Sequence, residues 1–520
     1  MNNKFYITTP IYYPSGKFHI GTAYSTLLAD AIKRYKVLRG YDAYMLTGVD
    51  EHGQKVEKVA EEHGISPQEH VNQMAEESIK LWKTMKISND DFIRTTEPRH
   101  TKVVEKVFTQ LQENGDIYLG KYNGWYCTPC ETFFTEFQLV DGKCPDCGRE
   151  VEKMSEESYF FNMKKYESRL MKFYDENPEF LLPISRKNEI INNFLKPGLD
   201  DLCVTRTSFD WGIKVPNNSK HVIYVWLDAL LNYITAIGYG SDDETLFNKY
   251  WPADLQIIGK DIIRFHAIYW PIFLMALDLP LPKHIYAHGW YVMKDGKMSK
   301  SKGNVYYPDV LAEKYGVDAT RYLLLREIAY DNDGVFSLES FLERYNSDLS
   351  NDLGNLVSRT IGMINKYFDG KILSYNGKPN EYDEEVEQFV TGQISVIENK
   401  FDTVHVAEAM NEIWKIISRS NKYIDETAPW TLFKNCDNTE KLQSVMYHLL
   451  ENIRKVAILI KPFMPDISEQ ILDSFNISDE FRTWESIKKY DVLSDIQVVE
   501  KIEPLFARLD IKKELENQNQ

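Results

Sequence analysis

The stretch Phe5-Tyr-Ile-Thr-Thr9 begins the pattern that decides the fold of the N-terminal part of the chain. It is short, β-branched and aromatic, which is typical of a strand. A loop rich in Pro, Tyr and Gly follows at residues 10–16, and a helical pattern then covers about residues 21–39. With the strand-like run Tyr44-Met-Leu-Thr-Gly48, this predicts a parallel strand–helix–strand unit. In open α/β sheets ligands bind at the carboxyl ends of strands, so we expect the first loop to bind one.

The rest of the chain divides into three kinds of pattern. Between residues 118 and 216 lie clustered cysteines and irregular aromatic runs, which we interpret as an insertion into the sheet domain. From about Ser337 onward, apolar residues recur at three- and four-residue spacing, which predicts a helix bundle. The strand-like runs that resume the sheet are Val222–Trp226, Asp254–Ile258 and Lys283–His288, and the predicted helices are Leu349–Lys366, Asp383–Lys400, Val404–Asp425 and Asn438–Lys461.

Composition excludes several classes of protein. The 520 residues, 43% hydrophobic and 27% charged, are typical of a folded chain of three to five domains rather than a disordered or coiled-coil protein. A net charge of −17 argues against coating nucleic acid through bulk positive charge. The most apolar segment, residues 266–281, is broken by Pro271, Asp278 and Pro280, so no membrane span is predicted. No targeting segment precedes the first strand, and we expect a cytoplasmic protein.

Four of the six cysteines form two close pairs within 21 residues. Cys127 and Cys130 make one C-x2-C turn, and Cys144 and Cys147 make the other. In a reducing compartment this spacing favours zinc over disulfides, the alternative being two unrelated turns. Four thiolates complete a tetrahedron with no open position, which is the geometry of a structural rather than a catalytic ion. The sequence therefore predicts one structural Zn²⁺.

Two further stretches carry residues that suit an anion. His19-Ile-Gly21 precedes the first helix, where a glycine admits a phosphate and the helix dipole favours negative charge, although such a pattern is more often plain turn chemistry. Lys297-Met-Ser-Lys300-Ser-Lys302 follows the turn Lys294-Asp-Gly296. Lysine is a flexible point charge that suits a leaving phosphate group, and the alternative is a solvated surface loop.

Together these two elements resemble the paired signatures of class I aminoacyl-tRNA synthetases. In detail the chain resembles the methionyl-tRNA synthetase family, in order from residue 5 to about residue 465. One position departs, because the family's first signature usually ends in His and here ends in Thr22, a shorter donor that is never charged. The matching stretches are Thr8–Pro14, Leu46–Lys55, Ser88–Thr96, Arg206–Ile213, Tyr224–Ala229, Ile258–Ile262, Asn351–Arg359 and Asp425–Trp430.

The resemblance implies a two-step reaction. The carboxylate of L-methionine attacks the α-phosphorus of ATP to give methionyl-adenylate and pyrophosphate, and the terminal adenosine of tRNA(Met) then accepts the methionyl group. Both steps need positioning and charge stabilisation rather than a protein nucleophile. By resemblance the catalytic residues are His19, Thr22, Lys297 and Lys300. ATP, which brings Mg²⁺, is expected to contact His19, Gly21, Gly259, Asp261, Lys297 and Lys300.

The resemblance also implies a methionine pocket and an anticodon site. Asp50 is expected to bind the ammonium group. Anticodon bases are read by stacking on aromatics and by hydrogen bonds from Asn or Arg, which the resemblance assigns to Trp430, Asn355 and Arg359. Taken alone, an Asn and an Arg at that spacing are most often a solvated face. The other pocket positions are Ile11, Tyr13, Trp226, Ala229, Tyr233, Ile262 and His266, several of which read as interior residues without the resemblance.

The expected fold is an α/β Rossmann-type parallel-sheet catalytic domain split by a zinc-knuckle insertion and followed by an all-α helix-bundle anticodon-binding domain. Longer family members carry an appended tRNA-binding and dimerising domain, which this chain lacks, so we expect a monomer. The expected segments are residues 1–117 and 217–292 for the catalytic domain, 118–216 for the insertion, 293–348 for the lysine loop (the KMSKS loop) and stem-contact region, 349–510 for the helical domain and 511–520 for a polar tail.

Three other interpretations compete with this one. A leucine or valine synthetase is disfavoured because the chain has no room for a large editing insertion and its pocket is aromatic. A catalytically silent paralogue that only binds tRNA is suggested by Thr22, but Lys297, Lys300 and Asp50 argue against it. A purely structural zinc protein leaves Asp50 and the lysine loop unexplained.

Overall fold

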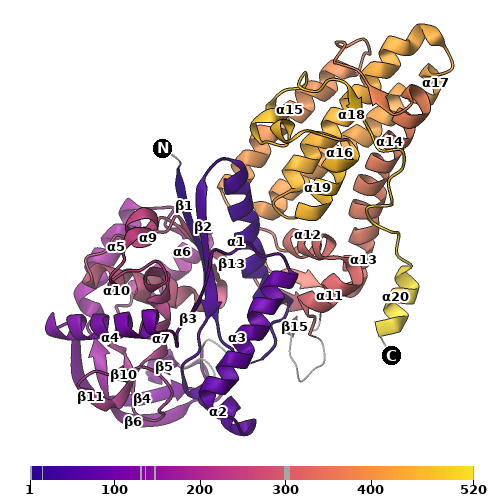
Figure 1. The fold of residues 1–520 in the computed structure, drawn as a ribbon. Helices are drawn as coiled ribbons and strands as arrows, with labels where there is room; N and C mark the ends of the chain where they lie inside the picture. Colours follow the sequence, from indigo (N-terminus) through magenta and orange to yellow (C-terminus); the bar gives the residue numbers. More distant parts are fainter. Residues whose placement is uncertain are drawn as a thin grey trace. The chain divides into compact units, whose positions relative to one another are not determined.

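The structure is a computed structural model that describes residues 3–14, 16–128, 132–134, 136–145, 148–294, 296–297 and 305–518 (Figure 1). The chain divides into two compact units. The first unit consists of residues 1–29 and 42–288, and the second of residues 30–41 and 289–520. Each unit is described by itself below.

The first unit is built on a six-stranded sheet whose neighbouring strands all pair in parallel. Its order is β3-β2-β1-β12-β13-β7, so the chain leaves β1 in one direction and β12 in the other. Loops diverge at such a reversal and open a crevice at the carboxyl ends of the two strands. The strands are β1 (Lys4–Tyr12), β2 (Asp42–Val49), β3 (Asp91–Arg94), β7 (Leu181–Leu182), β12 (Leu255–Gly259) and β13 (Ile285–His288).

Helices cover this sheet and bury its residues. Residues 5–10 of β1 and all of β12 are buried, as expected for parallel strands packed on both faces. Local signals define the ends of some helices; the Ser66 hydroxyl, for example, accepts a hydrogen bond from the amide of Glu69 at the start of α3. The helices are α1 (Ile20–Leu38, which continues into the second unit), α2 (Gln54–Glu62), α3 (Pro67–Thr84), α4 (Pro98–Glu113), α5 (Glu167–Glu176), α6 (Ile184–Ile190), α7 (Val225–Leu230), α8 (Asn232–Thr235), α9 (Thr245–Tyr250) and α10 (Trp270–Ala276).

Two small antiparallel sheets occupy the segment predicted as an insertion. A four-stranded sheet has the order β5-β4-β6-β8, and a three-stranded sheet has the order β10-β11-β9. Residues 181–182 of the same segment instead form β7, which pairs with β13 in the parallel sheet. The strands are β4 (Ile117–Cys127), β5 (Thr132–Phe134), β6 (Glu152–Phe161), β8 (Leu202–Cys203), β9 (Thr205–Arg206), β10 (Lys214–Val215) and β11 (Asn218–Ile223).

One predicted strand of the parallel sheet is wrong. The run Val222–Trp226 does not enter that sheet, because its first two residues end β11 and its last two begin α7. A short apolar run of β-branched and aromatic residues does not distinguish a buried strand from a buried helix. The correction moves Trp226 from a strand to a helix.

The second unit is mainly helical, and the four predicted helices are confirmed with small shifts at their ends. Helix α18 is buried continuously from Ser444 to Ile460 and contacts α14, α15, α16 and α19 (Figure 1). A π-helical segment, Tyr345–Gly354, leads directly into α14. The helices are α11 (Pro308–Tyr315), α12 (Val317–Glu327), α13 (Leu338–Arg344), α14 (Asn355–Phe368), α15 (Asp383–Asp402), α16 (Val406–Thr427), α17 (Pro429–Leu432), α18 (Thr439–Ile460), α19 (Pro465–Ser474) and α20 (Ile511–Gln518).

Two small sheets complete the second unit. One has the order β15-β14-β16 and the other pairs β17 with β18. Within the part of the chain that the structure describes, no helix is long and apolar enough to cross a membrane. The strands are β14 (Tyr291–Met293), β15 (Gly296–Lys297), β16 (Gly334–Phe336), β17 (Lys371–Ile372) and β18 (Ile496–Gln497).

Candidate functional site

The loop after β1 ends at His19, whose ring caps the start of α1. Nδ1 of His19 accepts hydrogen bonds from the backbone amides of Gly21 (3.1 Å) and Thr22 (3.3 Å). An atom that accepts from two N–H groups carries no proton, so the ring proton of neutral His19 lies on Nε2. The first helical amides, which the sequence suggested for an anion, are therefore engaged by the histidine, and Nε2–H becomes the donor.

The loop after β12 lies on the other side of the strand-order reversal. Gly259 ends β12, and a Cβ there would lie 2.5 Å from the Asp261 carboxylate, so a larger residue would require this side chain to shift. On the neighbouring strand, His288 lies 2.6 Å from the hydroxyl of Ser25 in α1 and contacts the ring of Tyr24 edge-on. The sheet thus brings Gly259 and Asp261 to the same edge as the loop after β1, as expected for two of the ATP positions.

Three of the predicted pocket residues form one hydrogen-bonded chain. His266 Nδ1 lies 3.0 Å from the carbonyl of Ile262, and its Nε2 lies 2.7 Å from the hydroxyl of Tyr233. A carbonyl only accepts, so Nδ1 carries the proton and Nε2 accepts from Tyr233. Burial, which leaves the His266 side chain 2% exposed, lowers its pKa to about 4. The pair is therefore uncharged at neutral pH.

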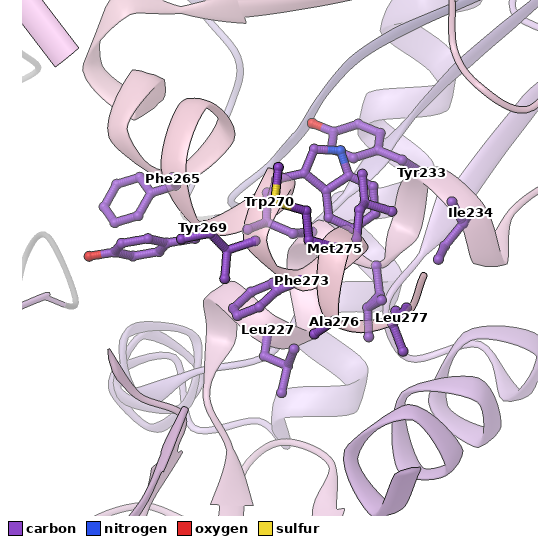
Figure 2. Close-up of a cluster of buried hydrophobic side chains, with 14 of the residues drawn as sticks. Leu227, Tyr233, Ile234, Phe265, Tyr269, Trp270, Phe273, Met275, Ala276 and Leu277 are labelled. Carbon is purple, nitrogen blue, oxygen red and sulfur yellow. The ribbon is translucent and has the colours of Figure 1, made fainter. Parts of the chain in front are cut away.

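Aromatic side chains surround this pair. Trp226 of α7 stacks on Phe265, with ring centroids 3.6 Å apart and planes 8° from parallel. Tyr233 contacts the ring of Trp270, and Figure 2 shows both rings within a cluster of buried apolar side chains from α8, α10 and the π-helical segment Phe265–Tyr269. Ala229 is buried, and Ile11 and Ile262 are half-buried. The wall is apolar except for a few neutral polar groups, one of which, Trp226 Nε1, has no hydrogen-bond partner among the described residues.

The other two predicted pocket residues lie where β1 and β2 end. Asp50 is buried, and its amide donates to the carbonyl of Tyr12 at 2.9 Å. Tyr13 donates its hydroxyl hydrogen bond to the carbonyl of His52 at 2.9 Å, and Lys55 lies over its ring. The loops after β1 and β2 are thus tied to each other. The loop after β2 carries two buried carboxylates, Asp50 and Glu51, and that of Glu51 pairs with Arg94 at 2.7 Å.

A buried carboxylate that the sequence analysis did not single out links these elements. Asp228 of α7 is fully buried and accepts from His52 Nδ1 and from His100 Nε2, each at 2.7 Å. His100 is held in turn by Thr235 at 2.8 Å. Although burial alone raises the Asp228 pKa, His52 and His100 outweigh it and hold that pKa below its usual value. One clue was available, since Asp228 is the single charged residue in the apolar run Tyr224–Leu231.

The lysine signature belongs to the second unit and is described only in part. Lys297 lies in β15, which pairs antiparallel with β14, while Lys300 lies outside the described residues. Gly296 takes a φ of 111°, a left-handed backbone that favours glycine at the end of the turn. Met293 pairs with Gly296 just before Lys297, while Asp295 of the predicted turn lies outside the described residues.

The three predicted RNA-contacting residues lie on the second unit. Asn355 and Arg359 lie one turn apart in α14, where Asn355 is exposed and Arg359 lies 3.7 Å from Asp425. Trp430 lies in α17 with 43% of its surface exposed, which is unusual for the largest apolar side chain. All three are accessible to a ligand.

One cysteine from each predicted zinc turn is described, and the two lie in one cluster. Cys127 and Cys144 are buried together with Phe134, and the carbonyl of Cys144 accepts from the amide of Gly148 at 2.8 Å. Cys130 and Cys147 lie outside the described residues. Two buried cysteines from separate C-x2-C turns fit a shared metal better than two unrelated turns.

Two family models match the chain. The model described as tRNA synthetases class I (M) matches residues 5–155 and 149–361, and the anticodon binding domain of methionyl tRNA ligase matches residues 374–519. Methionine–tRNA ligases of Bacillus subtilis (strain 168) and Listeria monocytogenes serotype 4b (strain F2365) are each 56% identical to the chain over 526 residues. Each alignment covers 99% of this chain and 79% of the relative.

Solved structures agree with the sequence comparisons. Mycobacterium tuberculosis methionyl-tRNA synthetase in complex with methionyl-adenylate is 39% identical, with a TM-score of 0.93, and the match covers 97% of this chain and all of the other. The apo form of the same enzyme has a TM-score of 0.84 at 37% identity, covering 98% of this chain and 99% of the other.

Proposed function

The chain belongs to the class I methionine–tRNA ligase family, and from this premise we propose how its residues divide the work of the reaction. It activates L-methionine with ATP to methionyl-adenylate, releases pyrophosphate, and transfers the methionyl group to the terminal adenosine of tRNA(Met). The product supplies methionine to translation, both at initiation and during elongation.

The observation that carries the choice of methionine is the neutral Tyr233–His266 pair in an aromatic wall. A thioether is apolar and offers only a weak acceptor, so a pocket for it needs apolar surface and no charge near the sulfur. Burial holds the His266 pKa at about 4, which keeps the pair uncharged at neutral pH. We assign the remaining wall to Ile11, Tyr13, Trp226, Ala229 and Ile262.

The charged ends of the amino acid require separate partners. Asp50 is a buried carboxylate at the end of β2, close in the fold to the loop after β1, and it suits the methionine ammonium. A buried ion pair is stable when both charges are matched, and a bound ammonium would match this carboxylate. The methionine carboxylate stays free to attack the α-phosphorus of ATP.

The ATP residues act by orientation and charge. His19 Nε2–H and the Thr22 hydroxyl donate to phosphate oxygens, and the room left by Gly259 lets the Asp261 carboxylate accept from adenosine hydroxyl or amino groups. Lys297 and Lys300 stabilise the charge that develops on pyrophosphate as it leaves, while Mg²⁺ enters with ATP. No side chain needs to form a covalent bond.

Recognition of tRNA falls on the second unit. Trp430 stacks on an anticodon base, and Asn355 and Arg359 donate hydrogen bonds to its edges, which suits a single-stranded loop whose bases are splayed out. The exposed Trp430 ring supports this role.

We also propose one structural Zn²⁺ held by Cys127, Cys130, Cys144 and Cys147. It would hold together the segments that carry Cys127 and Cys144, which already share one buried cluster. Elemental analysis of protein purified without chelator should find one zinc per chain, and Cys127→Ser should lose it. Protein that is folded and free of metal would contradict the proposal.

Cytoplasmic location is proposed because ribosomes consume aminoacyl-tRNA there. The monomeric state expected from the sequence stays a prediction, which sedimentation at micromolar concentration checks.

Charging of tRNA(Met) with labelled methionine tests the proposed division of work. Wild-type protein should charge a tRNA(Met) transcript and lose most of its kcat/KM when the transcript's anticodon is changed. Equal charging of both transcripts would contradict the anticodon assignment without affecting the assignment of the amino-acid pocket.

A further inference from the structure

The loop after β2 begins with Asp50, and a single residue from a distant segment contacts the rest of it. Trp211 lies between β9 and β10. Its indole N–H donates to the carbonyl of Glu51 at 2.6 Å, and its own carbonyl accepts from the amide of Gly53 at 3.2 Å. Its ring meets that of His52 edge-on, with centroids 5.7 Å apart. Trp211 thus contacts each of the three residues that follow Asp50.

The residues next to Trp211 fix its position. A Cβ at Gly212 would lie 2.5 Å from Cγ1 of Val222, so a larger residue would push this segment away from its neighbour. On the other side, the amide of Asp210 donates to the carboxylate of Glu57 in α2 at 3.3 Å. The segment that carries Trp211 is therefore packed closely against the first unit.

The other polar groups of Glu51 are held by the segment that follows β3. Glu51 is fully buried, and its carboxylate accepts from Arg94 Nε at 2.7 Å and from the hydroxyl of Thr96. Its amide donates to the hydroxyl of Thr95 at 2.9 Å. Residues 94–96 thus hold the amide and the carboxylate of Glu51, and Trp211 holds its carbonyl.

Trp211 contacts the loop through its polar atoms, although tryptophan usually contributes buried area. Its side chain is only half-buried, whereas Trp82 and Trp270 of the same unit are fully buried. Without the indole N–H, the carbonyl of Glu51 would lose its donor and the peptide that follows could rotate. Asp50 would then turn relative to the rest of the loop. A carboxylate that binds an ammonium group tolerates a displacement of only about 0.5 Å.

We propose that Trp211 is a positioning residue for the Asp50 carboxylate and so sets the affinity for the ammonium group of methionine. Its indole N–H fixes the peptide between Glu51 and His52, and that peptide fixes the direction of Asp50. This proposal rests on the assignment of Asp50 to the methionine ammonium. A merely structural tryptophan would instead affect every ligand of the pocket equally.

Two ligands that differ only in the amino group separate these roles. L-Methioninol carries the thioether, an ammonium group and a hydroxyl, and 4-(methylthio)butan-1-ol is the same molecule without the ammonium group. Each is measured as an inhibitor of the methionine-dependent exchange of labelled pyrophosphate into ATP. A variant that misplaces Asp50 should weaken L-methioninol alone, because the other ligand has no charge for the carboxylate to match.

Trp211→Phe removes the indole N–H and keeps an aromatic ring. It should raise the Ki of L-methioninol by about tenfold, because the carboxylate is misplaced, and leave the Ki of 4-(methylthio)butan-1-ol unchanged. The KM for ATP should also stay unchanged. An equal rise in both Ki values would overturn the proposal, since it would show a general disturbance of the pocket. No rise in either value would overturn it as well.

Trp251 provides a matched control in the same unit. Its indole N–H also donates to a backbone carbonyl, that of Pro280, at 3.0 Å. Because Trp251 precedes β12, it lies at the opposite edge of the parallel sheet from the loop after β2. Trp251→Phe should lower the melting temperature at least as much as Trp211→Phe does and leave both Ki values unchanged. A selective rise in the Ki of L-methioninol with this control would overturn the proposal.

A second variant covers the case in which Trp211→Phe lowers the melting temperature much further. Thr96→Val removes the hydroxyl that holds the Glu51 carboxylate, so it loosens the same loop from its other contact. It should raise the Ki of L-methioninol alone, by about threefold, as expected for one lost hydrogen bond. A rise in both Ki values, or in neither, would overturn the proposal.

Asp50→Asn, measured in parallel, tests the assignment on which the proposal rests. It should raise the Ki of L-methioninol by about 100-fold and leave that of 4-(methylthio)butan-1-ol nearly unchanged. If Asp50→Asn is selective in this way and Trp211→Phe is not, the positioning role alone is overturned. If Asp50→Asn weakens both ligands equally, or neither, the assignment of Asp50 to the ammonium group is overturned as well.

Discussion

The proposed amino-acid pocket of the first unit and the proposed tRNA face of the second unit differ in how their side chains are held. In the pocket the polar groups are buried and bonded to one another, as in Tyr233–His266 and Asp228–His52. On the proposed tRNA face, the rings of Trp430 and Phe433 are exposed to solvent. A small apolar ligand offers few polar groups for recognition, so the shape and hydrogen bonding of its pocket must supply the specificity. A single-stranded loop brings its own bases to cover exposed rings.

This difference predicts two kinds of mutational effect. Substitutions among the buried polar groups should change stability and catalysis together, because each leaves a partner unsatisfied in the interior. Substitutions on the tRNA face should change binding of tRNA with little change in stability, because exposed side chains have few partners to lose. The four predictions below follow this division, from the largest effect to the smallest.

The largest effect is expected at Asp228. In Asp228→Asn an amide NH2 faces a ring N–H that previously donated to a carboxylate, so the free energy of unfolding should fall by about 3 kcal/mol. The loops that carry Tyr13 and Asp50 and helix α7, which carries Trp226, should shift, which should lower kcat/KM for methionine by about 100-fold in pyrophosphate exchange. Urea unfolding and exchange kinetics measure the two effects.

Two controls sharpen this test. Glu176→Gln breaks the exposed pair of Glu176 with Lys172 and should change the free energy of unfolding by about 0.5 kcal/mol or less. Because the Asp228 pKa is lowered by folding, its contribution is complete above the ordinary aspartate pKa and is lost as pH falls through the folded-state value. The difference in the free energy of unfolding between wild type and Asp228→Asn should therefore become smaller in strong acid. Normal stability at neutral pH would contradict the role given to Asp228.

A smaller effect is expected at Trp430. Trp430→Ala removes one base stack and should lower kcat/KM for tRNA(Met) by about 30-fold. The midpoint of thermal unfolding should change little, because the ring is 43% exposed. Aminoacylation with varied tRNA, together with calorimetry, checks both. A large fall in the midpoint of thermal unfolding would contradict the difference proposed between this exposed residue and the buried polar groups of the pocket.

A still smaller effect is expected at Tyr233. Tyr233→Phe keeps the ring but leaves Nε2 of the buried His266 without its donor, so kcat/KM for methionine should fall about tenfold. The variant should also discriminate less well against norleucine, in which a methylene replaces the sulfur. Exchange kinetics with both amino acids measure this, and unchanged discrimination would show that the pair does not face the thioether.

The effect that is smallest at neutral pH is expected at His266, whose contribution changes only as pH falls. Folding lowers its pKa to about 4, so only the unfolded chain binds a proton between about pH 4 and 6.5. The free energy of unfolding should therefore fall as pH falls through this window, by up to about 1.4 kcal/mol per pH unit from this residue. His266→Gln should lack that part of the slope in urea titrations, and an unchanged slope would mean that His266 is protonated in the folded protein.

Local patterns predicted most of the fold. The strand, loop and helix at residues 4–38 and the four long helices follow from alternation and three- to four-residue spacing, which need no distant contacts. The run Val222–Trp226 was wrong because long-range pairing places its first residues in another sheet: Val222 and Ile223 pair with β9, and the amide of Tyr224 donates to the carbonyl of Val204. No local pattern contains that information.

The candidate site likewise contains some residues that local sequence patterns predict and others that they do not. The signature residues His19 and Lys297 and the cysteines proposed to hold zinc could be identified from their spacing, whereas the proposed pocket residues came only through the resemblance to a family. The link between His52, His100 and Asp228 joins three elements that are up to 176 residues apart, so it required the folded chain.

The measurement that tests the proposed function most directly is the exchange of labelled pyrophosphate into ATP that depends on methionine. Leucine, valine and homocysteine are measured separately as alternative substrates. The account predicts exchange with methionine, at a kcat/KM about 100-fold or more above that with leucine or valine and a smaller margin over homocysteine. It would also show that Thr22 serves in place of histidine. Exchange that is equal or stronger with leucine, or no exchange from folded protein that carries its zinc, would contradict the central claim.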